Sequence, residues 1–281
     1  MKAVNKIRGF FIYSNLFIAV CAVLMANQTY DFLLHSLPDW NLLFFIFFAT
    51  ICSYSFHWYF TFHSIIPSPR ISWTLQNKNT ILILFFTSLA GSGIFFFLLF
   101  SHWYWLLLAS IITFLYSAPK IPHPFFRALR KVALGKTIFL ALVWMYVTTV
   151  LPIVVSRQPW KPDFIFFILS RFFLVYAICI LFDLRDREND KADGIRSLVT
   201  FLSTQNIFII FVFSLLVFAA TTIWMLQFDY PLASIFIILI PGIIVASLYN
   251  YAKINFSDLL YYFVLDGLMA LSAILMLIPG I

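Results

Sequence analysis

The stretch FIFFILSRFFLVYAICILFDLRDREND, residues 164–190, joins a long apolar run directly to a cluster of carboxylates. A helix needs about 20 apolar residues to cross the hydrocarbon core of a bilayer. Residues 164–182 meet that length and contain one charged residue, Arg171. The stretch therefore predicts a membrane-spanning helix that reaches a polar surface just before Asp183.

The rest of the chain repeats this apolar pattern. Of its 281 residues, 63% are hydrophobic and 10% are charged, whereas soluble domains carry about 25% charged residues. The sequence predicts an all-α integral membrane protein, a single domain over residues 1–281 with a bundle of about nine transmembrane helices. The candidate spans are residues 9–27, 41–61, 80–100, 103–118, 134–155, 164–182, 204–226, 232–250 and 258–279.

The distribution of positive charge predicts the orientation of these spans. All but three of the 18 Lys and Arg residues fall in the N-terminal tail or in loops on its side of the membrane. The exceptions are Arg157, Lys161 and the intramembrane Arg171. Because basic loops stay in the cytoplasm, we expect a cytoplasmic N-terminus in the cell (inner) membrane, with the longest polar loops on the cytoplasmic side.

Charge and cysteine content also narrow the expected partners. In an integral protein, an excess of 18 Lys and Arg over 11 Asp and Glu indicates contact with anionic membrane lipid and no nucleic acid. The three cysteines lie inside apolar segments without paired spacing, so we expect no disulfide partner. They are Cys21, Cys52 and Cys179.

The carboxylates after the apolar run form a pattern. Their spacings of three, four and three residues put four of them on one stripe of a helix, with Glu188 on another face. They are Asp183, Asp186, Asp190 and Asp193. Like charges so close together repel, and a divalent cation would offset the repulsion. Mg²⁺ favours one or two carboxylates plus phosphate oxygens. The alternative is a solvated, salt-bridged loop.

Two motifs resemble those of a known family. The stretch DLRDRENDKADGIRSL, residues 183–198, is similar to the second Asp-rich motif of the UbiA superfamily of membrane-embedded prenyltransferases, with Ser197 in the position of a threonine. The stretch LYSAPKIP, residues 115–122, resembles the Tyr-Ser-x-Pro element that follows the family's fourth helix. The predicted helix count and the order of the motifs agree, so the resemblance covers almost the whole chain.

The resemblance implies an enzyme whose cavity opens to the membrane and holds an isoprenyl diphosphate. Mg²⁺ on the Asp-rich motifs would grip the diphosphate, and ionisation would give an allylic cation that alkylates an aromatic or lipid-like hydrophobic acceptor. Diphosphate leaves readily only when metal ions and Lys or Arg neutralise its developing charge. The cation in turn needs a water-poor pocket with aromatic faces nearby.

The resemblance also assigns roles to particular residues. Asp186 and Asp190 match the metal-binding, catalytic carboxylates. Asp183, in the leading position of the same motif, is a further candidate for the metal site, and Tyr116 is a further catalytic candidate. Tyr116 matches the tyrosine of the second element, and Lys120 lies where that loop offers a basic side chain. Further candidates for substrate contact are Lys191, Arg196, Arg70 and His57.

The family's first Asp-rich motif, Asn-Asp-x-x-Asp-x-x-x-Asp, is missing. The corresponding stretch reads CSYSFHWYFTFHSIIPSPR, residues 52–70, and no Asp or Glu occurs between Asp39 and Asp163. His57 and His63 are about 240° apart on a helix, and Mg²⁺ prefers oxygen ligands, so the histidines do not replace the motif. We expect for them a structural role or a hydrogen bond to substrate.

The missing motif leaves a second hypothesis open, which is a catalytically inactive UbiA fold that binds an isoprenoid, a lipid or a protein partner. A transporter is a third, with less support because no broken-helix pair or inverted repeat is evident. Arg171 and Asp266 lie within predicted spans, where charged residues usually face the bundle interior. We expect them to pair with each other or to line the cavity.

Overall fold

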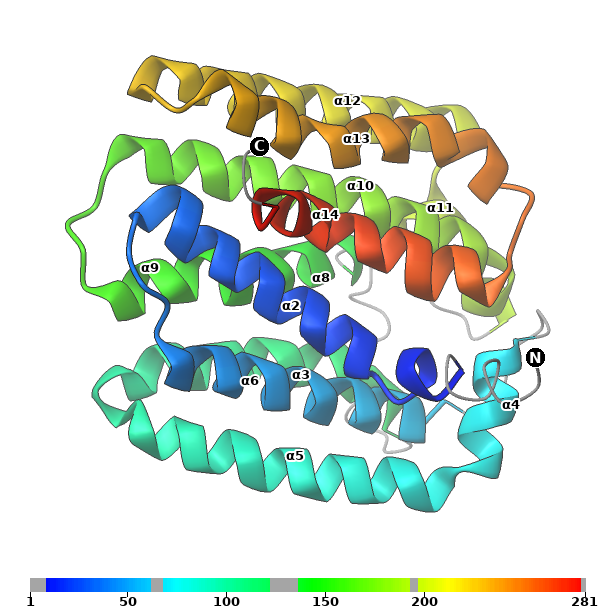
Figure 1. The fold of residues 1–281 in the computed structure, drawn as a ribbon. Helices are drawn as coiled ribbons and strands as arrows, with labels where there is room; N and C mark the ends of the chain where they lie inside the picture. The colour runs from blue at the N-terminus through cyan, green and yellow to red at the C-terminus, as the bar shows by residue number, and fades with distance from the viewer. Residues whose placement is uncertain (1–8, 62–67, 122–135, 193–196, 279–281) are drawn as a thin grey trace.

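The computed structural model describes residues 9–61, 68–121, 136–192 and 197–278 of the chain. The protein is all-helical, with no strand in these ranges. Every predicted span corresponds to a helix, which confirms an all-α membrane protein. The bundle is drawn in Figure 1.

Seven helices in the described ranges are long and apolar enough to cross a membrane. Three of them continue from an α-helix into a π- or 3₁₀-helical segment. The seven are α2 (Leu16–Gln28) with η1 (Thr29–Leu34), α3 (Trp40–Tyr59), α5 (Lys78–Leu98), α8 (Lys136–Met145) with η5 (Tyr146–Val150) and α9 (Leu151–Ser156), α10 (Pro162–Ala192), α12 (Thr204–Trp224) with η6 (Met225–Phe228), and α13 (Leu232–Ala252).

The two remaining predicted spans form shorter helices. They are α6 (Trp103–Ser117), flanked by η2 (Phe100–His102) and η3 (Ala118–Lys120), and the pair η7 (Leu260–Leu265) and α14 (Asp266–Met276). Two short helices, α4 (Pro69–Gln76) and α11 (Leu198–Phe201), lie at one end of the bundle (Figure 1).

Helix α10 corrects the expected position of the acidic residues. The span was predicted to end at residue 182, but α10 continues to Ala192 and carries Asp183, Asp186 and Asp190 itself. Residues 183–192 contain no Gly or Pro and include several good helix formers, so nothing ends the helix at the membrane surface. The acidic stripe is therefore held rigidly on the central helix of the bundle.

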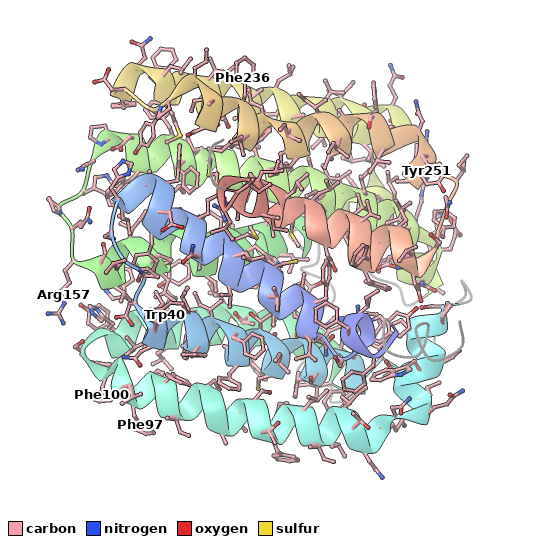
Figure 2. All side chains as sticks on the ribbon, viewed as in Figure 1. Trp40, Phe97, Phe100, Arg157, Phe236 and Tyr251 are labelled. Atoms are coloured by element: carbon pink, nitrogen blue, oxygen red, sulfur yellow. The ribbon has the colours of Figure 1, made fainter. Side chains whose placement is uncertain are left out.

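The core is organised around α10, which packs against α8, α12, α13 and α14. Helix α5 packs along α3 and buries only Ile81 and Ser88 among its side chains, so most of its apolar surface faces outward. Figure 2 shows Phe97, Phe100 and Phe236 projecting from the outside of the bundle. Such exposed apolar side chains are expected where lipid replaces water as the solvent.

The first predicted span is interrupted at Asn15. Its φ of 68° places it in the left-handed region, between a helical stretch at residues 9–13 and α2. Asn adopts this conformation more readily than most residues do. The break turns the buried Asn15 side chain toward α3, where its amide donates to Ser55 Oγ at 3.3 Å.

Candidate functional site

A cavity of about 550 Å³ opens within the bundle. Helices α3, α5, α6, α8, α10 and α14 and the short helix α4 all contribute to its lining. Much of the wall is aromatic or aliphatic. The apolar lining includes Phe45, Phe56, Phe85, Leu89, Phe114 and Trp144.

The acidic stripe of α10 forms one polar wall of this cavity. Asp183, Asp186 and Asp190 all line it, as the sequence spacing predicts, and Asn189 joins them. Asp183 and Asp190 are buried, and Thr137 Oγ1 on α8 donates a hydrogen bond to Asp183 Oδ2. The carboxylates predicted to bind metal therefore line the cavity, with Asp190 buried and Asp186 partly buried.

Glu188 and Lys191 lie on the other side of the same helix. Both are exposed, and Lys191 Nζ is 2.9 Å from Glu188 Oε1. Lys191, predicted to bind substrate, does not line the cavity. Arg196 and Asp193 lie outside the described residues. The helix thus separates carboxylates that face the chamber from charges that face the surroundings.

The opposite wall comes from α3, the helix whose end lacks the first Asp-rich motif. Ser53 and His57 of this helix, and Thr61 just beyond its end, line the cavity without contributing a carboxylate. The His57 ring stacks on the Tyr116 ring, with centroids 5.6 Å apart. Tyr116 and Lys120 also line the cavity, whereas His63 lies outside the described residues.

Two buried arginines supply positive charge to the same cavity. The Arg70 guanidinium packs against both the Trp58 and Tyr262 rings, 4.0 and 4.3 Å from their centroids. The Arg185 guanidinium lies 4.7 Å from the centroid of Tyr262. Planar guanidinium groups pack favourably on aromatic faces, which fixes their orientation. Tyr262 thereby holds both cations in place.

Asp258 is the carboxylate that supports these arginines. It forms an ion pair with Arg185 and accepts a hydrogen bond from the backbone N–H of Arg70 at 2.7 Å. The hydroxyl of Ser68 donates to the same carboxylate at 3.0 Å. Asp258 was not among the predicted site residues. The signal that the sequence offered is its position as the first residue of the predicted span 258–279.

Each arginine still has a buried donor to offer. Among the described residues, Arg70 Nε and Arg185 Nη1 are buried without a hydrogen-bond partner. Burial also lowers the pKa of Arg70, because desolvation disfavours the charged form. Unsatisfied buried donors are costly, so each of these atoms would gain from an acceptor.

The two intramembrane charges predicted to face the interior are both buried, but they do not pair with each other. Arg171 donates to the carbonyl of Met25 at 3.1 Å and to Gln28 Oε1 at 2.9 Å, away from the cavity. Asp266 lines the cavity instead. Arg171 is thus a structural tie between α10 and α2, and Asp266 belongs to the site.

The oxygen donors of α10 are chemically suited to Mg²⁺. Asp186, Asn189 and Asp190 lie within about one turn of the helix, and Mg²⁺ uses one or two protein carboxylates together with phosphate oxygens. Over the described ranges, no three His, Cys, Asp or Glu side chains converge as a complete metal cage. A magnesium ion at this wall would therefore share its coordination with substrate.

Comparison of this chain with protein-family models, with curated proteins and with solved structures finds no match. The likeness to the UbiA superfamily accordingly stays a prediction from the two motifs.

Proposed function

We propose that this protein is a membrane-embedded, UbiA-like prenyltransferase that transfers an isoprenyl group from an isoprenyl diphosphate to a hydrophobic acceptor. The observation that carries the proposal is the composition of one cavity, which combines buried guanidiniums and carboxylates with an extended aromatic wall. An isoprenyl diphosphate has the complementary composition, a highly charged head joined to an apolar tail.

The proposed topology has nine spans with a cytoplasmic N-terminus in the inner membrane, with α6 and the helical pair Leu260–Met276 completing the count. Its support is twofold. Chain reversals alternate between the two ends of the bundle in Figure 1. The basic residues gather in the loops at the end that holds α4 and α11, as expected for a cytoplasmic face.

The diphosphate head would bind between the two polar walls. Arg70 Nε and Arg185 Nη1 are donors suited to phosphate oxygens, and Lys120 adds a third cation that lines the cavity. Asp186 and Asp190 would hold Mg²⁺ against the opposite side of the head. When bound, Mg²⁺ neutralises the negative charge that develops on the leaving diphosphate.

In this proposal Arg70 replaces part of the positive charge that a metal ion on the missing first motif would bring to the diphosphate. A second metal ion would need carboxylates at the end of α3, where Ser53, His57 and Thr61 stand. The guanidinium packed against Trp58 and Tyr262 brings permanent positive charge to the same side without any carboxylate. The protein would thus use the guanidinium of Arg70 on the α3 wall and a bound Mg²⁺ on the α10 wall.

The reaction then follows from these positions. The C1–O bond of the donor breaks, its electron pair leaves with the diphosphate, and a nucleophilic atom of the acceptor bonds to C1. Arg70 and Arg185 stabilise the leaving group electrostatically, because their orientation is fixed before the reaction begins. The aromatic wall excludes water that would otherwise trap the allylic cation.

A titration of the purified full-length protein in lipid nanodiscs tests the proposal. Geranyl, farnesyl and geranylgeranyl diphosphate are added with and without Mg²⁺, and release of diphosphate is followed after addition of hydroxyaromatic acceptors. We expect binding that Mg²⁺ strengthens and that Asp186→Asn and Asp190→Asn weaken severely. Glu188→Gln, which changes an exposed acid of the same helix, is the matched control. Equal binding by all these variants would contradict the proposal.

A second candidate function is binding without catalysis. Its support is the complete lack of Asp and Glu between Asp39 and Asp163, which removes one set of metal ligands from the α3 wall. The same titration separates the two functions. A binding protein retains the isoprenyl diphosphate intact with every acceptor offered, whereas the transferase releases diphosphate.

A further inference from the structure

Asp266 is a carboxylate in the cavity that the proposed donor site does not use. It begins α14, directly after the π-helical segment η7, and only 8% of its surface is exposed. Its side chain lines the cavity together with Tyr54 of α3 and Met269 of its own helix. π-Helical segments often accompany functional sites, where they shift the direction of the following side chains.

Asp266 makes no hydrogen bond and no ion pair with any described residue. Arg70, Arg185 and Tyr54 are near enough to interact with it electrostatically, but none of them bonds to it. A carboxylate without a partner at membrane depth is costly, and such residues in membrane proteins usually serve a ligand or a proton. The cavity is the side from which a partner can reach it.

The position of Asp266 relative to the arginines is informative. Tyr262, whose ring contacts both guanidiniums, precedes Asp266 by about one helical turn, which corresponds to roughly 6 Å along the axis. Asp258, the carboxylate that supports Arg185, lies a further turn away in the opposite direction. Asp266 is therefore deeper in the bundle than the proposed head-group site. At this deeper level, C1 of an isoprenyl diphosphate would meet its acceptor.

We propose that Asp266 binds the acceptor, accepting a hydrogen bond from an O–H or N–H group and taking the proton that the acceptor loses on alkylation. The inference rests on the proposed function and adds the chemical class of the second substrate. The donor's C1–O bond breaks with its electron pair going to diphosphate, and the acceptor bonds to C1. The acceptor's proton moves to a carboxylate oxygen of Asp266. The acceptor is thus a hydroxylated or amino-substituted apolar molecule, most simply a phenol.

Binding of a matched pair of probes tests this role without requiring turnover. The probes are 4-hexylphenol and 4-hexylanisole, which differ in whether the ring oxygen can donate a hydrogen bond. They are titrated into the full-length protein in nanodiscs, beside farnesyl diphosphate as a separate measurement of the donor site. The variants are Asp266→Leu and Asp266→Asn. Asp163→Asn is the control, because Asp163 is also buried on this bundle but lies outside the cavity.

In the unaltered protein we expect the phenol to bind about tenfold more tightly than the anisole, because only the phenol can donate a charge-assisted hydrogen bond to Asp266. Asp266→Leu should remove the difference, and Asp163→Asn should preserve it. Farnesyl diphosphate should bind to Asp266→Asn within about threefold of the unaltered protein, since its head is held elsewhere.

Thermal unfolding separates this role from a structural one. Removal of a carboxylate without a partner should leave the unfolding temperature of Asp266→Asn unchanged or higher. If Asp266 only balanced the charge of Arg70 and Arg185, the unfolding temperature would fall, and phenol would show no preference over anisole in any variant. Either result overturns the inference. If phenol is preferred but farnesyl diphosphate does not bind, the proposed transfer reaction fails while the acceptor site stands.

Discussion

The two polar walls of the cavity differ in how they carry charge. The α10 wall presents Asp183, Asp186 and Asp190 on a single rigid helix. The α3 wall presents hydroxyls and an imidazole, and its charge comes from Arg70 on a separate short helix. In the proposed function, the first wall would bind a cation from solution, whereas the second wall already contains the guanidinium of Arg70.

The two walls also differ in how the orientation of their charged side chains is fixed. Carboxylates on one helical stripe share the geometry of the helix and need little further support. Arg70 comes from the short helix α4, so its orientation depends on Trp58, Tyr262 and the side-chain Oδ1 of Asn15, to which its Nη2 donates. Orienting Arg70 thus depends on more contacts with other parts of the fold than orienting the acidic stripe does.

The largest expected effect comes from removing the support of the cationic wall. Asp258→Ala would leave Arg185 buried without its counter-charge and would free Ser68 and the Arg70 N–H. Breaking one side of a buried ion pair costs about 3–5 kcal/mol. We expect a large fall in the unfolding temperature in nanodiscs, measured by intrinsic fluorescence. Glu188→Ala, which removes an exposed acid, should change stability by less than about 0.5 kcal/mol. A similar response in both variants would refute the buried network.

The next effect separates the two walls by their metal dependence. Arg70→Gln should weaken farnesyl diphosphate binding by about tenfold to a hundredfold, with and without Mg²⁺, because it removes a charged donor. Asp186→Asn should weaken binding only when Mg²⁺ is present. Isothermal titration with and without chelator checks both. If Arg70→Gln loses affinity only in the presence of Mg²⁺, the two walls do not act separately.

A third prediction makes the two walls more alike. His57→Asp restores a carboxylate to the α3 wall, facing the chamber that contains Asp186. We expect donor binding to become about threefold to tenfold more dependent on Mg²⁺, since a further oxygen ligand favours a hard cation. Magnesium titrations at fixed farnesyl diphosphate measure the change. His57→Asn, of similar size but uncharged, should not produce it. An unchanged magnesium requirement would place His57 too far from the head group.

The smallest expected effect concerns the outer side of α10. Lys191→Ala removes an exposed surface pair with Glu188, which contributes about 0–1 kcal/mol. Affinity for farnesyl diphosphate should stay within about twofold of the unaltered protein, because Lys191 does not line the cavity. A marked loss would mean that the charged surface of α10 also guides the substrate.

Much of the fold was accessible from the sequence because apolar length is a strong signal in membrane proteins. The helical spans and the shared face of Asp183, Asp186 and Asp190 follow from run lengths and from helical periodicity. The acidic stripe was expected to be helical, but its continuity with the apolar span in the single helix α10 was not predicted, although residues 183–192 contain no helix breaker. The hydropathy of a segment marks where the bilayer ends, and a helix can extend beyond that point.

The cationic side of the site was harder to predict because its contacts join distant parts of the chain. Ser68 and Asp258 are separated by 190 residues, and Asn15 and Arg70 by 55. No local pattern marks such pairs. The positive φ of Asn15 and the π-helical turn before Asp266 likewise depend on packing between helices rather than on local preference.

The contact of Asp258 with Ser68 and Arg70 has a consequence for how the molecule is made. Ribosomal synthesis delivers Ser68, next to α4, 190 residues before Asp258. Until the segment that contains Asp258 has entered the membrane, the guanidinium of Arg185 lacks its carboxylate. The arginine side of the cavity can therefore mature only after all the helices from α2 to α13 have been inserted.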